Sequence, residues 1–383
     1  MSSRLTERDA RHRRVHAQRL APHAQETATV ADIAAATLGL QAQETPSAAL
    51  SVRARGRGLT VADVDRALYE DRSVVRTWCM RGTLHLVATD DLSLLLSVFG
   101  PTFATRGPEP RRLAEWGLDE EAVEAAVETI GSVLADEGPL TKRDIAAHLV
   151  EAGVDVDPSS RAPNVLIRRA ALRGVLCEVA PVDGKNAYDL LDSWVTLDAP
   201  PDRETALATL ARRYLTAYGP TTKSDFAAWS GLYATDVQTA WDSLGDDARE
   251  VRVGDETMWV STDAPDALDD ESSASPHVRL LPRYDTFLLG YERTNRPIPT
   301  MYESHVWPGG GIIRPTVLVD GRVVGTWHLD RSRSPAIVTV SPFEPLDTLD
   351  PAGGEDVRDR IDAEASDVGR FLDTPVECRV EPE

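Results

Sequence analysis

An internal repeat constrains the fold of this chain more than any other feature of its sequence. Residues 138–146 read GPLTKRDIA and residues 219–227 read GPTTKSDFA, so six of the nine positions are identical. Such repetition predicts a supersecondary unit that is used more than once along the chain. The 383 residues are also too many for one ordinary domain, which favours several modules of roughly 100 residues each.

Each copy of the repeat lies at a helix boundary. An amphipathic segment, 120–136 or 204–217, precedes it and stops at the Gly-Pro pair. Within each copy, a Thr followed three residues later by an Asp is a variant of the capping box at a helix start. A second helix and a strand pair are expected to follow, at 163–173 with 176–180 and 187–191, and at 234–244 with 250–253 and 257–261. Helix, turn, helix and hairpin is the order of a winged helix.

A third, degenerate copy is traced near the N-terminus. Val30–Ala35 resembles the helix that begins at Arg143, and its wing is expected at Val75–Met80 and Thr83–Val87 around an Arg81-Gly82 turn. The segment from Asp263 to Pro276 is acidic, contains Ser and Pro, and has no periodicity, so it is interpreted as a linker.

The C-terminal third is predicted to be rich in strands. Thr316–Val319 and Val323–Trp327 flank Asp320-Gly321-Arg322, which is a strong hairpin signal. A helix over Asp356–Leu372 closes the chain. We therefore predict an α+β fold of tandem winged helix-turn-helix units with a C-terminal β-rich, barrel-like domain. The expected ranges are 1–100, 118–198 and 203–262 for the three units and 276–383 for the last domain.

Charge at first argues against a nucleic-acid ligand. The chain has 62 acidic and 41 basic Lys and Arg residues, a formal net charge of −21, and a negative field repels DNA. Arginines are nevertheless concentrated in three segments, 4–19, 53–57 and 168–173. Such segregation predicts a basic concave face on an acidic body.

Other classes of protein fit the sequence less well. No apolar run approaches the roughly 20 residues that cross a bilayer, and no secretory signal is recognisable, so a cytoplasmic protein without membrane contact is expected. Three widely separated cysteines indicate neither a disulfide framework nor a metal knuckle. Three units in one chain suggest a monomer that wraps double-stranded DNA.

Several sequence blocks carry a family resemblance. They are Leu38–Pro46 (LGLQAQETP), Arg76–His85 (RTWCMRGTLH), Leu280–Asp285 (LLPRYD) leading to Leu289-Gly290-Tyr291, and Gly325-Thr326-Trp327. In this order, over nearly the whole chain, they resemble the AlkZ/YcaQ-type winged-helix DNA glycosylases, whose catalytic signature is Gln, an apolar residue, then Gln or Asp. The resemblance implies that Gln41 and Gln43 are catalytic. It also implies a monofunctional alkylpurine DNA glycosylase, without cofactor or metal, that acts on N7 and N3 adducts and on interstrand crosslinks.

Two glutamines suit this chemistry. A purine alkylated at N7 or N3 is already cationic and departs as a neutral base, so no strong general acid is needed. A Gln carbonyl can accept a hydrogen bond from the incoming water and direct its dipole at the sugar, while the amide N–H groups fix the geometry. The alternative is that both glutamines are surface residues that cap the following helix.

The remaining site residues are cationic or acidic. Arg53, Arg55 and Arg57 are expected to contact phosphates, and Arg76 with Arg81 flank a wing that could enter a groove, although each Arg could equally face solvent in a turn. Asp285 is either electrostatic support for the sugar cation, a partner of an Arg, or a structural carboxylate. The alternative functions are a non-enzymatic winged-helix DNA-binding protein, such as a transcription regulator, and a protein interaction scaffold.

Overall fold

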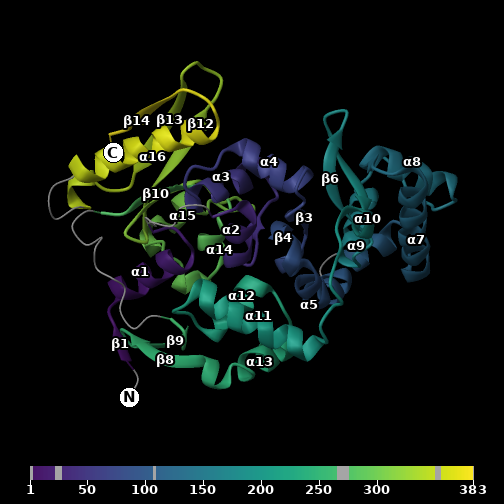
Figure 1. Cartoon of the computed structure of the whole chain (residues 1–383), viewed down its shortest axis with the longest axis horizontal. Coiled ribbons are helices and arrows are strands. Elements are labelled where there is room, and N and C mark those ends of the chain that lie inside the picture. The colour runs from purple at the N-terminus through teal and green to yellow at the C-terminus, as the bar shows by residue number, and fades with distance from the viewer. Residues whose placement is uncertain (1–2, 22–27, 107–108, 265–275, 350–354, 383) are drawn as a thin grey trace.

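Figure 1 shows the computed structural model, which describes residues 3–21, 28–106, 109–264, 276–349 and 355–382. Helices and strands are mixed along the chain, so the α+β class is confirmed. Most of the predicted linker, residues 265–275, lies outside the described residues. Within the described residues, no helix is both long enough and apolar enough to cross a membrane.

The first region contains the third copy of the repeat. Its elements are β1 (Ser3–Leu5), α1 (Glu7–Ala17), α2 (Val30–Ala36), β2 (Leu40–Gln41), α3 (Thr45–Arg55), α4 (Val61–Tyr69), β3 (Val74–Trp78), β4 (Leu84–Ala88), α5 (Leu92–Thr105) and α6 (Glu109–Glu115). The helix expected at Val30 begins with a capping box in which Thr29 and Asp32 bond each other's backbone N–H. The strand pair predicted around Arg81-Gly82 is present as the antiparallel strands β3 and β4.

The two clear copies of the repeat form the same kinds of element. The second region has α7 (Glu120–Glu137), β5 (Leu140–Thr141), α8 (Lys142–Glu151), α9 (Ala162–Leu172), β6 (Leu176–Val182), β7 (Lys185–Leu190) and α10 (Leu191–Trp194). The third has α11 (Arg203–Tyr218), α12 (Lys223–Ser230), α13 (Ala234–Asp242), β8 (Ala248–Val253) and β9 (Glu256–Ser261). Both predicted capping boxes, Thr141 with Asp144 and Thr222 with Asp225, are confirmed.

Strand pairing joins regions that are separate in the sequence. The order β2-β4-β3-β6-β7-β5 makes one six-stranded sheet from the first and second regions, with Arg76 on β3 opposite Glu178 on β6. At the other end of the molecule, β1 pairs in parallel with β8 of the third region. The hairpins of the first two regions therefore share one sheet, which brings Glu178 next to Arg76.

The C-terminal region is a curled sheet packed on one long helix. Its elements are β10 (Val278–Leu281), α14 (Thr286–Leu289), α15 (Glu303–Val306), β11 (Thr316–Val319), β12 (Arg322–Asp330), β13 (Ala336–Pro342), α16 (Glu355–Phe371) and β14 (Val376–Val380). The predicted β11–β12 hairpin and the closing helix are confirmed. The sheet order is β10-β11-β12-β13-β14, and α16 contacts both edge strands, so the sheet forms a half-barrel around the helix.

A buried aromatic cluster ties the third region to its neighbours. Tyr214 and Tyr218 of α11 stack with ring centroids 4.8 Å apart, and both contact Trp229 of α12. The Tyr214 hydroxyl donates to the Gly290 carbonyl in the C-terminal region, and the Tyr218 hydroxyl donates to the Thr37 carbonyl beside the first region's motif. Buried tyrosines of this kind contribute packing as well as hydrogen bonds, and all four regions contribute residues to the core around them.

Candidate active site

The Gln41-Ala42-Gln43 segment follows a tight turn at the end of α2. Leu38 and Gly39 both have positive φ, 57° and 101°, and the Gly39 N–H closes the helix by donating to the Ala34 carbonyl. A Cβ at Gly39 would lie 3.0 Å from Val87 Cγ1, so glycine is required both by the backbone and by the space. The turn directs the chain into β2, where Leu40 and Gln41 pair with Leu86 and His85 of β4.

The two glutamine side chains form a pair. Gln41 Nε2 donates to Gln43 Oε1 at 2.7 Å, and Gln41 Oε1 accepts from the Gln43 backbone N–H at 3.3 Å. Gln41 is buried, with 4% of its surface exposed, whereas Gln43 is exposed. The buried Gln41 amide therefore fixes the orientation of the exposed Gln43 amide.

The backbone of this motif is held from two sides. The Ala42 N–H donates to the Leu84 carbonyl at 2.8 Å, and the Ala42 carbonyl accepts from Arg76 Nε at 2.8 Å. Arg76 is buried and also ion-pairs with Glu178 of β6, which accepts a further bond from Asn186 Nδ2. The cross-region sheet thus supplies the carboxylate that holds the arginine under the motif.

A neutral histidine lies directly across the ladder from Gln41. His85 is 2% exposed, and its Nδ1 lies 2.9 Å from the Thr83 carbonyl, which places the ring proton on Nδ1. Burial, assisted by the Arg81 charge, lowers the pKa of His85 to about 3, although the Thr83 hydrogen bond acts in the opposite direction. The ring is therefore uncharged at neutral pH.

The two glutamines do not cap helix α3. Its N-cap residue is Glu44 and no side chain caps the first turn, so the alternative that Gln41 and Gln43 cap this helix is wrong. Glu44 instead forms an ion pair with Arg283 Nη1 at 2.7 Å, which connects the motif to the segment after β10.

Asp285 is wholly buried and paired to an arginine. Its oxygens accept from both terminal nitrogens of Arg55 at 2.8 and 2.7 Å, from the Ser51 hydroxyl at 2.8 Å, and from the Phe287 N–H at the start of α14. Burial alone would raise the pKa of Asp285, but the Arg55 charge and these hydrogen bonds outweigh burial and hold the pKa below its usual value. Because the side chain has no exposed surface, Asp285 is a structural partner of Arg55 and does not reach a sugar cation directly.

The expected phosphate contacts need correction for three arginines. Arg53 pairs with Glu364 and Asp367, Arg55 pairs with Asp285, and Arg76 pairs with Glu178; all three are buried. Guanidinium groups that are buried against carboxylates are not available to a groove. Arg81 is partly exposed and donates to the Trp229 carbonyl, and Arg57 is exposed.

Several residues that build the site were not predicted. Glu178, Ser51 and Arg283 each act through a partner far away in the sequence, and no local pattern marks them. Nothing in the sequence indicated that His85 lies across from Gln41. Among the described residues, no group of three His, Cys, Asp or Glu side chains is arranged to hold a metal ion.

Comparisons with known proteins agree over most of the chain. The family profile described as "DNA glycosylase AlkZ-like" matches residues 34–371. A protein of Streptomyces sahachiroi described as "Interstrand DNA cross-link repair glycosylase" is 29% identical over 347 residues, which cover 88% of this chain and 90% of the relative. The solved structure of Streptomyces sahachiroi DNA glycosylase AlkZ superposes with a TM-score of 0.80 at 25% identity, covering 99% of this chain and 100% of the other.

Proposed function

The chain belongs to the AlkZ-like DNA glycosylase family, and we propose that it is a monofunctional enzyme that hydrolyses the N-glycosidic bond of alkylated purines in duplex DNA. The observation that carries this proposal is the paired amide motif of Gln41 and Gln43, which is anchored through Ala42 at the position of the family's signature. Gln43 is the exposed member of the pair and the one that would contact the substrate first.

The chemistry follows from neutral amides held in fixed positions. An N7- or N3-alkylated purine carries a positive charge and leaves as a neutral base, so the enzyme must mainly stabilise the sugar cation and position a water molecule. The Gln43 carbonyl oxygen accepts from Gln41 Nε2 with one lone pair, so it would accept from that water with the other while Gln41 holds it in position. Preorganised dipoles act without reorganisation during the reaction, which is the usual source of such stabilisation.

We further propose that the three helix, helix and hairpin regions act as winged-helix units around the DNA. In this assignment the units span 1–100, 118–198 and 203–262, with a β-rich domain at 276–383, and one chain wraps one duplex. Arg57 and Arg81 would contribute to phosphate contacts because both retain some exposed surface.

Interstrand crosslinks are proposed as additional substrates. The Streptomyces sahachiroi relative is described as a cross-link repair glycosylase, and it aligns with 88% of this chain. A crosslinked base cannot rotate freely out of the duplex, so a substrate of this kind requires a site that is not a closed base pocket. The catalytic glutamine proposed to contact the substrate is exposed, which is compatible with that requirement.

The test is release of free base from methylated duplex DNA. The full chain is incubated with duplex that contains N7-methylguanine, and the products are separated by chromatography. We expect free 7-methylguanine and an intact backbone that breaks only after alkali. A sequence-specific regulator would release no base and would instead enrich one sequence from a randomised duplex pool, and that pair of results would refute the proposal.

A further inference from the structure

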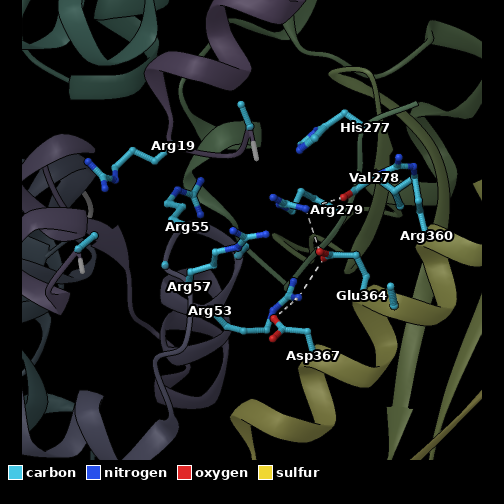
Figure 2. Close-up of a pocket in the computed structure, with 15 residues that line it drawn as sticks. Arg19, Arg53, Arg55, Arg57, His277, Val278, Arg279, Arg360, Glu364 and Asp367 are labelled. Atoms are coloured by element: carbon cyan, nitrogen blue, oxygen red, sulfur yellow. Dashed lines mark hydrogen bonds and ion pairs between the residues drawn. The ribbon is translucent and has the colours of Figure 1, made fainter. Parts of the chain in front are cut away.

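A cavity of about 270 Å³ lies between the end of α1, the end of α3, β10 and α16 (Figure 2). Helix α3 runs from Thr45 beside the glutamines to Arg55 at this cavity, and its 11 residues span roughly 16 Å. The cavity is therefore outside the candidate active site. Six arginines contribute to its wall: Arg19, Arg53, Arg55, Arg57, Arg279 and Arg360.

The carboxylates near this cavity are already occupied. Glu364 pairs with Arg53 at 2.9 Å and with Arg279 at 3.0 Å, while Asp367 pairs with Arg53 and with Arg370. Asp285 lies behind the cavity wall and forms an ion pair with Arg55.

Three guanidinium groups of the cavity wall form no ion pair within the described residues, although Arg19 interacts electrostatically with Asp32 over a longer distance. Within the described part of the chain, Arg19, Arg57 and Arg360 have no carboxylate within 4 Å. Figure 2 shows Arg57 on one side of the cavity and Arg360, from α16, on the other. In a chain with 62 acidic residues, a cavity with an excess of positive charge is unexpected unless it receives an anion from outside.

Buried hydrogen-bonding atoms without partners belong to residues that line the same cavity. They are the Nε atoms of Arg19, Arg53 and Arg55 and both ring nitrogens of His277, and these five belong to eight such side-chain atoms in the described residues. Leaving a buried donor unpaired costs about 1–3 kcal/mol, so native structures rarely tolerate several at one place. At least the three Nε–H groups are obligate donors, because arginine has no acceptor.

We propose that this cavity is a binding site for a phosphate group. A phosphate offers several acceptor oxygens in a small volume, and its negative charge would balance the guanidinium groups of Arg57 and Arg360. Guanidinium groups suit it because their N–H donors match the spacing of two phosphate oxygens. The phosphate belongs either to a nucleic-acid backbone or to free phosphate in solution. The site does not depend on the proposed glycosylase activity.

The binding test is calorimetric titration of the full chain with inorganic phosphate, with chloride adjusted to keep the ionic strength constant. Arg57→Gln/Arg360→Gln removes two exposed cations from the rim. Arg111→Gln/Arg333→Gln removes two exposed cations elsewhere and serves as the matched control. We expect saturable binding to the wild type, at least tenfold weaker binding to the rim variant, and affinity within twofold of wild type for the control. Absence of saturable binding to the wild type, or equal affinity of both variants, overturns the proposal.

A competition experiment separates the two sources of phosphate. Binding of an undamaged duplex is measured with and without inorganic phosphate at the same ionic strength. If the site holds a backbone phosphate, free phosphate weakens duplex binding by the wild type and has less effect on the rim variant. If it holds free phosphate, duplex affinity is the same with and without phosphate while the calorimetric binding persists. Loss of base release in the assay above would not alter either result, so the two proposals fail independently.

Discussion

At the scale of single residues, the arginine under the glutamine motif has two separable roles. Arg76 balances the buried charge of Glu178 and also holds the Ala42 carbonyl. Arg76→Met should destabilise the fold by about 3–5 kcal/mol, because it leaves Glu178 buried without a partner. Arg76→Met/Glu178→Leu should recover most of that stability, measured by urea unfolding.

Base release should not recover in the same double variant. Both side chains of the ion pair are gone, but the Ala42 carbonyl still lacks its donor, so the glutamines are no longer held in register. The single-turnover rate of base release should stay well below that of the wild type while the affinity for duplex changes little. Recovery of the rate together with stability would show that Arg76 does not position the motif.

His85 makes the stability of the protein depend on pH. Its pKa is about 3 in the folded state and about 6.5 in an unfolded chain. Stability is therefore complete above pH 6.5, and it is lost as the pH falls toward 3, because only the unfolded chain binds the proton in that window. His277, whose pKa burial also lowers to about 3, acts in the same direction.

Replacement of this histidine should flatten the pH profile. The free energy of unfolding of the wild type should decrease between pH 7 and pH 5. That of His85→Gln should decrease over the same range by about 2 kcal/mol less. Urea unfolding at a series of pH values gives both slopes. Identical slopes would mean that His85 is protonated equally easily in the folded and unfolded chains.

At the scale of elements, the two copies of the repeat use the same cap in different surroundings. Asp144 bonds only within its own box, with Thr141. Asp225 is fully buried and also accepts from the Glu292 N–H at 2.8 Å and from Asn295 Nδ2 at 3.1 Å. The second box therefore anchors the C-terminal region as well as starting a helix.

This difference predicts unequal costs for equivalent substitutions. Asp144→Ala should lower the free energy of unfolding by about 1 kcal/mol, as loss of a cap usually does. Asp225→Ala should cost at least about 3 kcal/mol, because it leaves several buried donors unpaired. Urea midpoints of the two variants provide the comparison, and equal midpoints would contradict the buried role of Asp225.

Short-range sequence patterns correctly predicted where helices α8 and α12 begin. The Thr-x-x-Asp boxes placed the starts of α8 and α12 because a cap involves residues only three apart. The β3–β6 pairing could not be predicted, because Arg76 and Glu178 are 102 positions apart and neither strand contains a sequence feature that identifies the other. The C-terminal half-barrel was predicted as a β-rich, barrel-like domain, but hairpin signals gave neither its strand order nor the contacts of α16 with both edge strands.

Some residues of the candidate site were also predicted from the sequence, and others were missed. The family resemblance indicated Gln41 and Gln43, and the structure brings their side chains together. The burial of Arg53 and Arg55 was missed because their carboxylate partners, Glu364 and Asp285, lie 311 and 230 positions away. A cluster of arginines in a sequence shows only that the charges need partners, and the fold decides whether those partners are carboxylates or a ligand.

At the scale of the whole molecule, the net charge of −21 should make the fold sensitive to salt. Repulsion among surface carboxylates destabilises the compact state, and added ions screen it. The melting temperature should therefore rise as KCl increases from about 10 mM, where the screening length is roughly 30 Å, toward 1 M, where it is roughly 3 Å. A neutral solute at equal osmolality is the control, and a melting temperature that does not rise with KCl would contradict this expectation.

We propose that the anchored amide pair of Gln41 and Gln43 performs the excision. The most direct test is the single-turnover rate of 7-methylguanine release by Gln41→Ala/Gln43→Ala, with its melting temperature and its affinity for the same duplex measured in parallel. We expect a rate at least about 100-fold below wild type, with the melting temperature and the duplex affinity little changed. A variant that releases the base as fast as the wild type would place the chemistry elsewhere in the molecule.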